Sequence, residues 1–277
     1  MKLKAILLMP TIAFFCVFTI WPIGEVIWLS FYKTNFVISA FVGLDNYKTV
    51  FKDIDFLISI GNSFLYSMIL IPGQVCMSVL CSLLIYKLNK KWQDISRVLF
   101  YIPVLSSGII IAQVWKWGFN INGPINWFLN LFGIENIIWF AQSTTGIPAI
   151  AFIVVISSFG LNVILLMASI LEIDKSILEA AEIDGASLSQ KNKFIVIPSI
   201  INTIKVISIL SAVGAFQIYE TILLLCPFPY MATMTFRIYT TAFKYSKYGM
   251  GSVEAIVLIF IIGILLFIQR KLQNEKE

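Results

Sequence analysis

The sequence predicts an all-α protein that crosses a membrane six times. Of its 277 residues, 59% are hydrophobic and only 13% are charged, whereas soluble domains are about half apolar and a quarter charged. The apolar residues stand in long blocks, each with about the 20 residues that cross ~30 Å of hydrocarbon. We therefore expect a polytopic membrane protein with a single transmembrane domain over residues 1–277.

Six apolar blocks can be read along the chain. The first is too long for a signal-peptide core and lacks a small-residue cleavage site, so we expect it to remain as a span. The expected spans are residues 5–29, 58–86, 98–117, 147–171, 195–225 and 250–268, with a polar loop at 172–194 between the fourth and the fifth.

The positions of lysine and arginine predict the orientation. With the N-terminus inside, the inner segments carry twelve of these residues and the outer segments seven, while Lys205 lies in the fifth span near its inner end. Cytoplasmic segments are enriched in Lys and Arg. We therefore expect both termini and the 172–194 loop on the cytoplasmic side.

Several kinds of site are excluded or disfavoured. Histidine is absent, which removes histidine-dependent triads and histidine-ligated metals. The cysteines lie in or beside apolar blocks without CxxC spacing, so we expect packing residues rather than a metal site or a disulfide framework. They are Cys16, Cys76, Cys81 and Cys226. No basic patch with interleaved aromatics is present, so nucleic-acid binding is not expected.

The polar loop contains the stretch "LEAAEIDGASLSQ". Ser176 stands three residues before Glu179, a capping-box spacing that predicts the start of a short helix. Gly185 is placed to end that helix in a left-handed conformation. Ser187 with Gln190 then predicts a second capping box, whose helix continues into the fifth span.

Two interpretations of this loop remain open at the level of local structure. It is either an ordinary capped loop between two spans or a docking element that fits a groove in another subunit. Ala180 and Ala181 offer a flat surface for close approach, and Glu179, Glu182 and Asp184 surround it with negative charge. Further on, Pro198 is expected to disturb the second helix near the membrane surface.

The spacing of this loop resembles a family signature. Permease subunits of binding-protein-dependent ABC importers carry E-A-A, three residues, G, nine residues and I-x-L-P. This chain matches at Glu179, Ala180, Ala181, Gly185, Ile195 and Pro198, and departs only at Ile197, where leucine is usual. The match lies between the fourth and fifth spans and leads directly into a span, as in that family.

The resemblance covers nearly the whole chain and points to sugar-importer permeases related to the maltose and glycerol-phosphate systems. The blocks "FVGLDNY", "FYIPVLSSGIIIAQVWKWGFNINGPIN", "FGLN" and "GAFQIYE" fall where the family has similar ones. One place departs. After the fifth span the family usually has a T-G-G-G-P turn, and this chain has "CPFPYMAT", so the resemblance does not extend to the shape of that loop or to its contacts with the binding protein.

The resemblance implies a type I ABC importer permease (MetI-like) fold in a bacterial inner membrane. The loop would be the coupling helix that enters a cleft of a cytoplasmic ATPase, with Glu179 as charged anchor, Ala180 and Ala181 as packing face and Gly185 as turn. The implied partners are a second similar permease, two ATPase copies, an external solute-binding lipoprotein, membrane lipid and a sugar-type solute. Because the chain has no phosphate-binding loop, ATP and Mg would be bound by the ATPase, with no cofactor on this chain.

The same resemblance places the solute between the fourth and fifth spans. Counting outward from the loop gives the candidates Ser157, Ser158 and Leu161 in the fourth span, and Ser211, Ala215 and Ile218 in the fifth. Gln217 is a further candidate for the pathway. The serines could bind sugar hydroxyls, or they could be small packing residues that let helices approach.

Carboxylates near the spans raise the same question. A carboxylate inside a membrane is a functional candidate by default. Glu25, Glu220 and Glu254 are also placed where they could lie at the water interface, with no role in transport.

Three rival functions need different features in the sequence. A glycerol-phosphate permease differs from a sugar permease only in its solute. A polytopic membrane enzyme would need paired acids or a metal motif at one membrane face, and the inner-face acids stand instead at helix-cap spacing. A secondary transporter or channel would usually show internal repeats or a buried charge pair, and neither is evident in the sequence. The sequence therefore favours a transport subunit rather than an enzyme.

Overall fold

A computed structural model describes residues 2–35, 37, 39–225 and 228–274, and within them the chain is almost entirely helical, which confirms the all-α class. Cys226, in the loop that departs from the family pattern, lies outside the described residues. The first part contains α1 (Lys2–Phe15), a π-helical turn η1 (Cys16–Ile20), α2 (Trp21–Leu29), β1 (Tyr32–Thr34), β2 (Ser39–Phe41), α3 (Asp45–Lys52), α4 (Ile54–Ile85), α5 (Lys90–Leu105), α6 (Gly108–Gly118) and α7 (Pro124–Asn130).

The second part begins with the long helix α8 (Ser143–Leu171). It continues with α9 (Lys175–Ile183), α10 (Leu188–Lys191), the π-helical turn η2 (Asn192–Val196), α11 (Ile197–Ser199), α12 (Ile201–Phe216), α13 (Glu220–Leu225), the 3-10 turn η3 (Pro229–Met231), α14 (Met234–Tyr239), the π-helical turn η4 (Thr240–Lys244) and α15 (Tyr248–Asn274).

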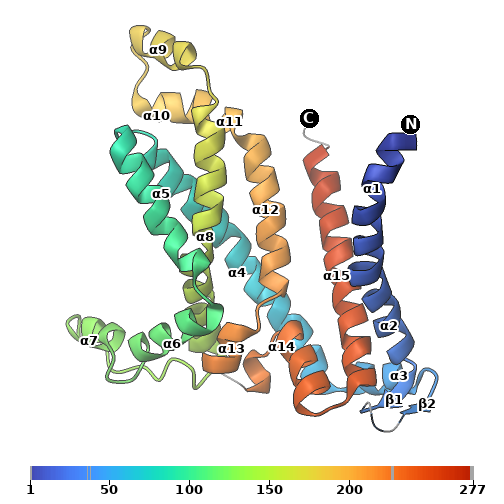
Figure 1. Cartoon of the computed structure of the whole chain (residues 1–277). Coiled ribbons are helices and arrows are strands. Elements are labelled where there is room, and N and C mark those ends of the chain that lie inside the picture. The colour runs from blue at the N-terminus through green and yellow to red at the C-terminus, as the bar shows by residue number, and fades with distance from the viewer. Residues whose placement is uncertain (1, 36, 38, 226–227, 275–277) are drawn as a thin grey trace.

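Four helical segments are long and apolar enough to cross a membrane, and two further helix pairs would each make one broken span, giving up to six in the described residues. The four are Met9–Leu29, Ile54–Ile85, Ser143–Leu171 and Tyr248–Lys271. Figure 1 shows both termini and the α9–α10 loop at one end of the bundle, which we call the termini end. Helices α6, α7, α13 and α14 and the β-hairpin lie at the opposite end.

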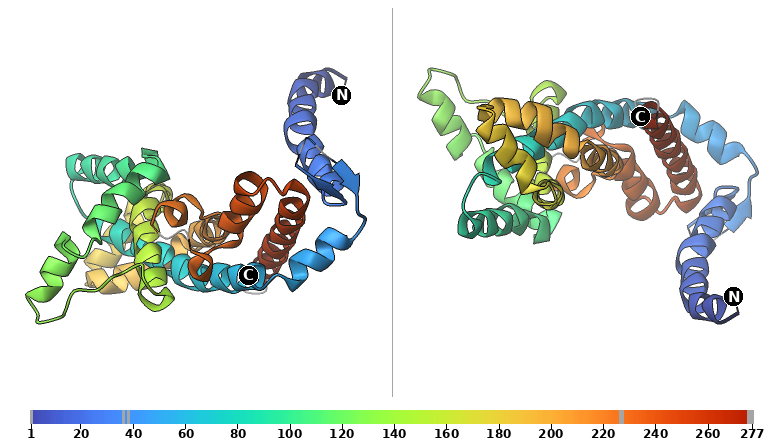
Figure 2. Two further views of the ribbon diagram at one scale, coloured as in Figure 1. Left: turned by 90° about the horizontal axis from the view of Figure 1, so that it is seen from below. Right: turned by 90° about the horizontal axis from the view of Figure 1, so that it is seen from above.

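The centre of the bundle is α4, which packs against α8 and α12. Helix α5 packs on α8, and α15 packs on α2, α3 and α14. Figures 1 and 2 show α1 and α2 at the edge of the molecule beside α15. The span Met9–Leu29 has no buried residue in its most apolar window, so its surface is left to lipid or to another subunit.

The third expected span, residues 98–117, is wrong as a single helix. The chain forms α5 and α6, which meet at an angle of 97°. Pro103 has no N–H for the last turn of α5, and Ser106 is extended, with ψ 145°. The side chain of Ser107 then accepts a hydrogen bond from Ile109 N and caps α6. The apolar run does not reveal this break, because the residues are equally apolar before and after the change in direction of the helix axis.

The predicted disturbance at Pro198 is confirmed, and the fifth expected span, residues 195–225, is wrong at its outer end. The helical path bends by 67° between residues 199 and 201, directly after Pro198. It then ends at Phe216, and Gln217 caps it. Residues 220–225 form the separate helix α13, which packs beside α6. The apolar character continues past Phe216 because α13 is buried among other helices, not because it extends the span.

The chain after α13 is attached to the first turns of α4. Asn62 Nδ2 donates to the carbonyl oxygens of Tyr230 (3.1 Å) and Ala232 (3.0 Å). Ser63 Oγ accepts a hydrogen bond from Met234 N at 2.9 Å. These contacts join parts of the chain about 170 residues apart, so the described end of the "CPFPYMAT" segment is packed on α4 and is buried from Met231 onward.

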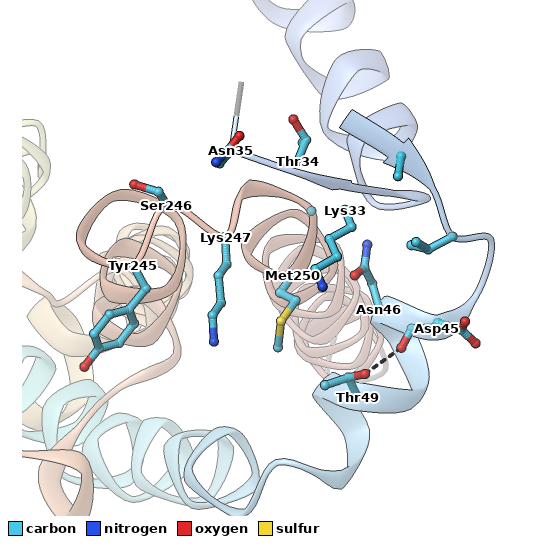
Figure 3. A pocket seen from close by; sticks show the side chains of 13 residues that line it. Lys33, Thr34, Asn35, Asp45, Asn46, Thr49, Tyr245, Ser246, Lys247 and Met250 are labelled. Carbon is cyan, nitrogen blue, oxygen red and sulfur yellow. Dashed lines mark hydrogen bonds between the residues drawn. The ribbon is translucent and has the colours of Figure 1, made fainter. Parts of the chain in front are cut away.

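A cavity of about 830 Å³ opens at the opposite end, between the β-hairpin, α3 and the start of α15 (Figure 3). Asn46 Nδ2 donates to the carbonyl oxygens of Ser30 (2.8 Å) and Tyr32 (2.9 Å), which holds the hairpin on α3. Lys33 and Lys247 line the cavity, and both are exposed. The cavity therefore presents cationic groups on the face away from the α9–α10 loop.

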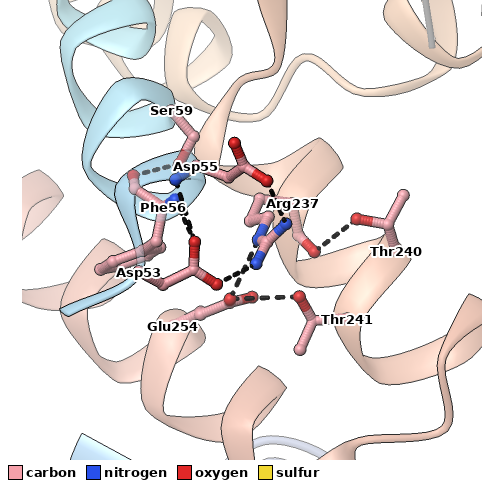
Figure 4. A network of polar contacts seen from close by, with 8 residues as sticks. All are labelled: Asp53, Asp55, Phe56, Ser59, Arg237, Thr240, Thr241 and Glu254. Carbon is pink, nitrogen blue, oxygen red and sulfur yellow. Dashed lines mark hydrogen bonds and ion pairs between the residues drawn. The ribbon is translucent and has the colours of Figure 1, made fainter. Parts of the chain in front are cut away.

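An ion-pair network ties α4 to α14 and α15 at the same end (Figure 4). The guanidinium of Arg237 contacts Asp53, Asp55 at 3.7 Å and Glu254 at 3.4 Å. Asp53 also caps α4, because its side chain accepts from the N–H groups of Asp55 and Phe56. The network thus fixes where α4 begins, which is four residues before the expected start of the second span.

Glu254 does not lie at the water interface. Its side chain is fully buried, and Oε1 accepts hydrogen bonds from Arg237 Nε and from Thr241 Oγ1 at 3.1 Å. Its other oxygen, Oε2, has no hydrogen-bond partner among the described residues. A buried carboxylate is stable only when paired, so Glu254 depends on Arg237. Glu25 in α2 is exposed, and Glu220 in α13 is only partly buried.

Helices α5 and α8 approach closely at Gly160. A Cβ atom at this position would lie 1.8 Å from the carbonyl oxygen of Phe100. We expect Gly160→Ala to lower stability by at least about 1–3 kcal/mol, because the two helices would have to separate. Thermal unfolding of the purified protein in detergent measures this. Gly263→Ala in α15, where nothing lies within 4 Å of the added atom, is the matched control, and equal melting temperatures for both variants would contradict the packing.

Removal of the Arg237 guanidinium should lower the stability of the protein severely. We expect Arg237→Met to destabilise the protein by about 3–5 kcal/mol, because buried Glu254 would lose its charge partner. Lys48→Met is the control, since the pair that Lys48 makes with Asp45 is about 70% exposed on both sides and such pairs contribute about 0–1 kcal/mol. A melting temperature for Arg237→Met that equals the control would show that the network does not hold the helices.

Candidate functional site

The loop between α8 and α12 projects beyond the ends of the long helices at the termini end (Figure 1). It consists of two helices, α9 and α10, joined by a turn at Gly185. The φ of Gly185 is +78°, a left-handed conformation that glycine adopts without steric cost. The N–H of Ala186 donates to the carbonyl of Ala181 at 2.9 Å, which completes the end of α9. The predicted glycine stop is confirmed.

Of the two capping boxes predicted for α9 and α10, the structure contains one. The capping box of Ser187 and Gln190 is confirmed, with both reciprocal hydrogen bonds present. The box of Ser176 and Glu179 is wrong. Helix α9 begins two residues earlier, and Asp174 is its cap, accepting from Ser176 N at 2.9 Å. A carboxylate two residues upstream supplies a stronger acceptor than the serine hydroxyl.

The cap also explains the acidity of Asp174. Hydrogen bonds from the backbone and side chain of Ser176 hold its pKa below the usual value. A carboxylate with a depressed pKa stabilises the helix above its unfolded pKa, and the effect is lost as pH falls through the folded pKa. The Asp174 carboxylate therefore stabilises the start of α9 at neutral pH.

The surface of α9 combines charge with exposed apolar groups. Glu179 and Ala180 are exposed and Ala181 is half-buried. Ile183 is 87% exposed and Ile177 is 51% exposed. Apolar side chains held this far out on a short, well-capped helix are typical of a docking surface.

The other side of the loop is anchored in the bundle. Leu178 packs against an apolar cluster formed by the ends of α8, α4 and the start of the fifth helical path. Ile195 lies half-buried in η2, and Pro198 is exposed in α11 immediately before the bend. Of the residues in the signature, the structure thus brings Glu179, Ala180 and Gly185 to the tip, and Ile195 and Pro198 to the membrane end.

The candidates in the fourth span make bonds within the bundle. The hydroxyls of Ser157 and Ser158 each donate to the carbonyl four residues earlier, at 2.6 and 2.5 Å. Ser158 Oγ also accepts from Gln74 Nε2 at 2.7 Å, which joins α8 to α4. Leu161 is 40% exposed.

The candidates in the fifth span comprise buried side chains and one exposed side chain. Ser211 is buried and accepts a hydrogen bond from Asn162 Nδ2 at 3.3 Å. Ala215 is buried in the apolar core, together with Ile218. Gln217 is exposed at the end of α12. The structure therefore does not gather the seven candidates into one cavity, and only Leu161 and Gln217 among them are exposed.

Two amides that join helices were missed as partners of these serines. Gln74 and Asn162 stand inside apolar runs, where an uncharged polar residue is a signal for an interhelical hydrogen bond. The sequence could not show which hydroxyl each would meet, because both partners lie on other helices. Among the described residues, no three Cys, Asp or Glu side chains are grouped to hold a metal ion.

Comparison with known sequences gives a family for most of the chain. Residues 74–276 match the model of the binding-protein-dependent transport system inner membrane component. The lactose transport system permease protein of Rhizobium radiobacter is 24% identical over 276 residues, covering 97% of this chain and 93% of that protein.

Two further relatives are of similar length. A probable ABC transporter permease of Bacillus subtilis is 28% identical, over 93% of this chain and 91% of its own. The trehalose/maltose transport system permease of Thermococcus litoralis is 26% identical, over 94% and 90%.

Solved structures agree on the fold. A chain from a bacterial ABC transporter involved in the import of the acidic polysaccharide alginate superimposes with a TM-score of 0.86 at 21% identity, covering 99% of this chain and 96% of that one. The type I importer permease fold expected from the loop signature is confirmed. The loop, the broken spans and the family match agree, and the chain is a transport permease of the binding-protein-dependent transport system inner membrane component family.

Proposed function

We propose that this chain is one of two similar permease subunits of an ATP-driven importer, and that the pair forms the path for a carbohydrate delivered by an external solute-binding protein. The observation that carries the proposal is the projecting loop, in which Gly185 turns α9 back toward the bundle and leaves Ile183 exposed. A capped helix of this form is suited to a groove on a second protein.

The loop is the proposed contact with the ATPase. Ile177 and Ile183 supply apolar area, Ala180 permits close approach, and Glu179 adds a charge at the rim of the contact. Burial of exposed apolar side chains is the main source of affinity in such interfaces. ATP and Mg would be bound by two copies of that partner, since this chain has no phosphate-binding loop.

The proposed topology puts the loop and both termini in the cytoplasm. The three lie at one end of the bundle (Figure 1), and the inner segments carry the larger share of Lys and Arg. The cavity beside Lys33 and Lys247 would then face outward, on the side where a solute-binding protein arrives. The chain is a component of the inner membrane by family.

A carbohydrate is the favoured solute class. Lactose, multiple-sugar, arabinooligosaccharide and trehalose/maltose permeases are among the relatives. A non-sugar solute such as glycerol-phosphate remains the alternative, and uptake of labelled sugars against labelled glycerol-phosphate separates the two. In either case, rigid-body rocking about a central site would alternate access to the two sides.

We expect Gly185→Val to abolish uptake. A β-branched residue at a φ of +78° costs about 1–3 kcal/mol and would open the turn. The spans should still insert, so the measurements are membrane content, co-purification of the ATPase and solute uptake. Gly185→Asn is the matched control, because asparagine tolerates the left-handed region, and it should keep most of the uptake. Normal uptake by Gly185→Val would refute the coupling role.

The solute path has a separate prediction. Gln217 is exposed at the end of α12 and Ser211 is buried. We expect Gln217→Ala to raise the KM for uptake by about 5- to 30-fold, the effect of one lost hydrogen bond to an uncharged or charged group, without loss of ATPase association. Ser211→Ala should change stability more than KM. An unchanged KM in Gln217→Ala would remove this residue from the path.

A further inference from the structure

The α9–α10 loop is joined to the inner end of α4 by a short hydrogen bond. The hydroxyl of Tyr86 donates to Asn192 Oδ1 at 2.6 Å. Tyr86 is the residue that caps α4, and Asn192 is the first residue of the π-helical turn η2. The two residues are 106 positions apart, so the bond connects elements that the chain does not connect locally.

On the loop side, Asn192 is fixed to both short helices. Its neighbour Lys191 is only 16% exposed and pairs with Glu182 of α9 at 3.0 Å. This ion pair crosses the Gly185 turn and ties α10 to α9. A displacement of α9 would therefore be passed to Asn192 rather than absorbed in the turn.

On the membrane side, Tyr86 belongs to a rigid corner. Its N–H donates to the carbonyl of Ser82, and its own carbonyl accepts from Gln93 Nε2 at 2.9 Å. The same amide donates to the carbonyl of Leu88 at 2.8 Å. Because Gln93 is in α5, the end of α4, the connecting turn and the start of α5 are held as one unit.

The ring of Tyr86 has a second, independent contact. It packs against the apolar cluster of Val196, Ile170 and Ile200, which also receives Leu178 of α9. A tyrosine hydroxyl is protonated at neutral pH and is able to donate. Packing and hydrogen bonding can be separated by experiment, since phenylalanine keeps the ring.

Helix α4 can carry a displacement across the whole bundle. It is a continuous helix of 32 residues, and its other end is held by Asp53, which pairs with Arg237. The contacts at its two ends thus join the loop to the network around Glu254. Figure 1 shows α4 running obliquely from the one end to the other.

We propose that the Tyr86–Asn192 hydrogen bond is the joint through which movement of the α9–α10 loop reaches α4 and α5. Tyr86 and Asn192 are positioning residues: they touch neither solute nor nucleotide, and they make the spans follow the loop. This inference rests on the proposed function, in which the loop moves with an ATPase.

The test is the amount of solute imported per ATP hydrolysed by the complete importer in proteoliposomes, with its ATPase and binding protein. We expect Tyr86→Phe and Asn192→Ala each to lower this ratio about fivefold, the effect of one net hydrogen bond. ATP hydrolysis itself should continue. The double variant should lose no more than either single variant, because both remove the same bond.

Two control variants and a stability measurement distinguish a bond that transmits movement from a bond that only stabilises the fold. Asn192→Asp keeps an acceptor for the Tyr86 hydroxyl and should restore the ratio. Tyr101→Phe, in α5, removes a hydroxyl for which no hydrogen bond is seen among the described residues, and should leave the ratio unchanged. A structural role alone would lower the melting temperature and the yield of the complex while the ratio per ATP stays constant.

Two results would overturn the inference. One is a ratio in Tyr86→Phe equal to that of the parent. The other is a double variant whose loss is the product of the single losses, about 25-fold, because independent effects multiply. Failure of the proposed function looks different, since the parent importer itself would then show no hydrolysis-dependent uptake.

Discussion

Helix α4 packs over much of its length against α8 and α12 through a buried polar face. Five serines of α4 are buried, and each hydroxyl donates to a backbone carbonyl, so none is left unsatisfied in an apolar surrounding. They are Ser59, Ser63, Ser67, Ser78 and Ser82. Small residues allow close approach where lipid offers no hydrophobic gain for association, and the bundle is arranged around this contact.

Helix α4 makes polar contacts at its start, its middle and its end, and the kind of contact differs between these three positions. A charged network lies at its start, where Asp53 meets Arg237. An amide–hydroxyl bond joins Gln74 to Ser158 in the middle, and the Tyr86 hydroxyl meets Asn192 at the other end. Charge is thus confined to the end of the helix, where its desolvation is less costly, while neutral groups serve in the interior. One helix can in this way connect both faces of the protein.

The parts of the fold and site that could be predicted are those with a local cause. The Gly185 turn and the Ser187–Gln190 cap follow from backbone preference within a few residues. The bend between α5 and α6 and the end of α12 at Phe216 could not be predicted in this way. Hydropathy marks residues 98–117 and 195–225 as apolar whether they cross a membrane or pack inside a protein.

The sequence by itself determined the all-α class, the number of apolar blocks and the identity of the loop signature, because length, composition and turn chemistry act over short distances. Only the tertiary structure decided that Glu254 is buried beside Arg237, that Ser211 faces Asn162, and that α4 is joined to the loop at Tyr86. Each of these depends on which side chains of distant segments meet across a helix interface, and a pairing of that kind leaves no local pattern in the chain.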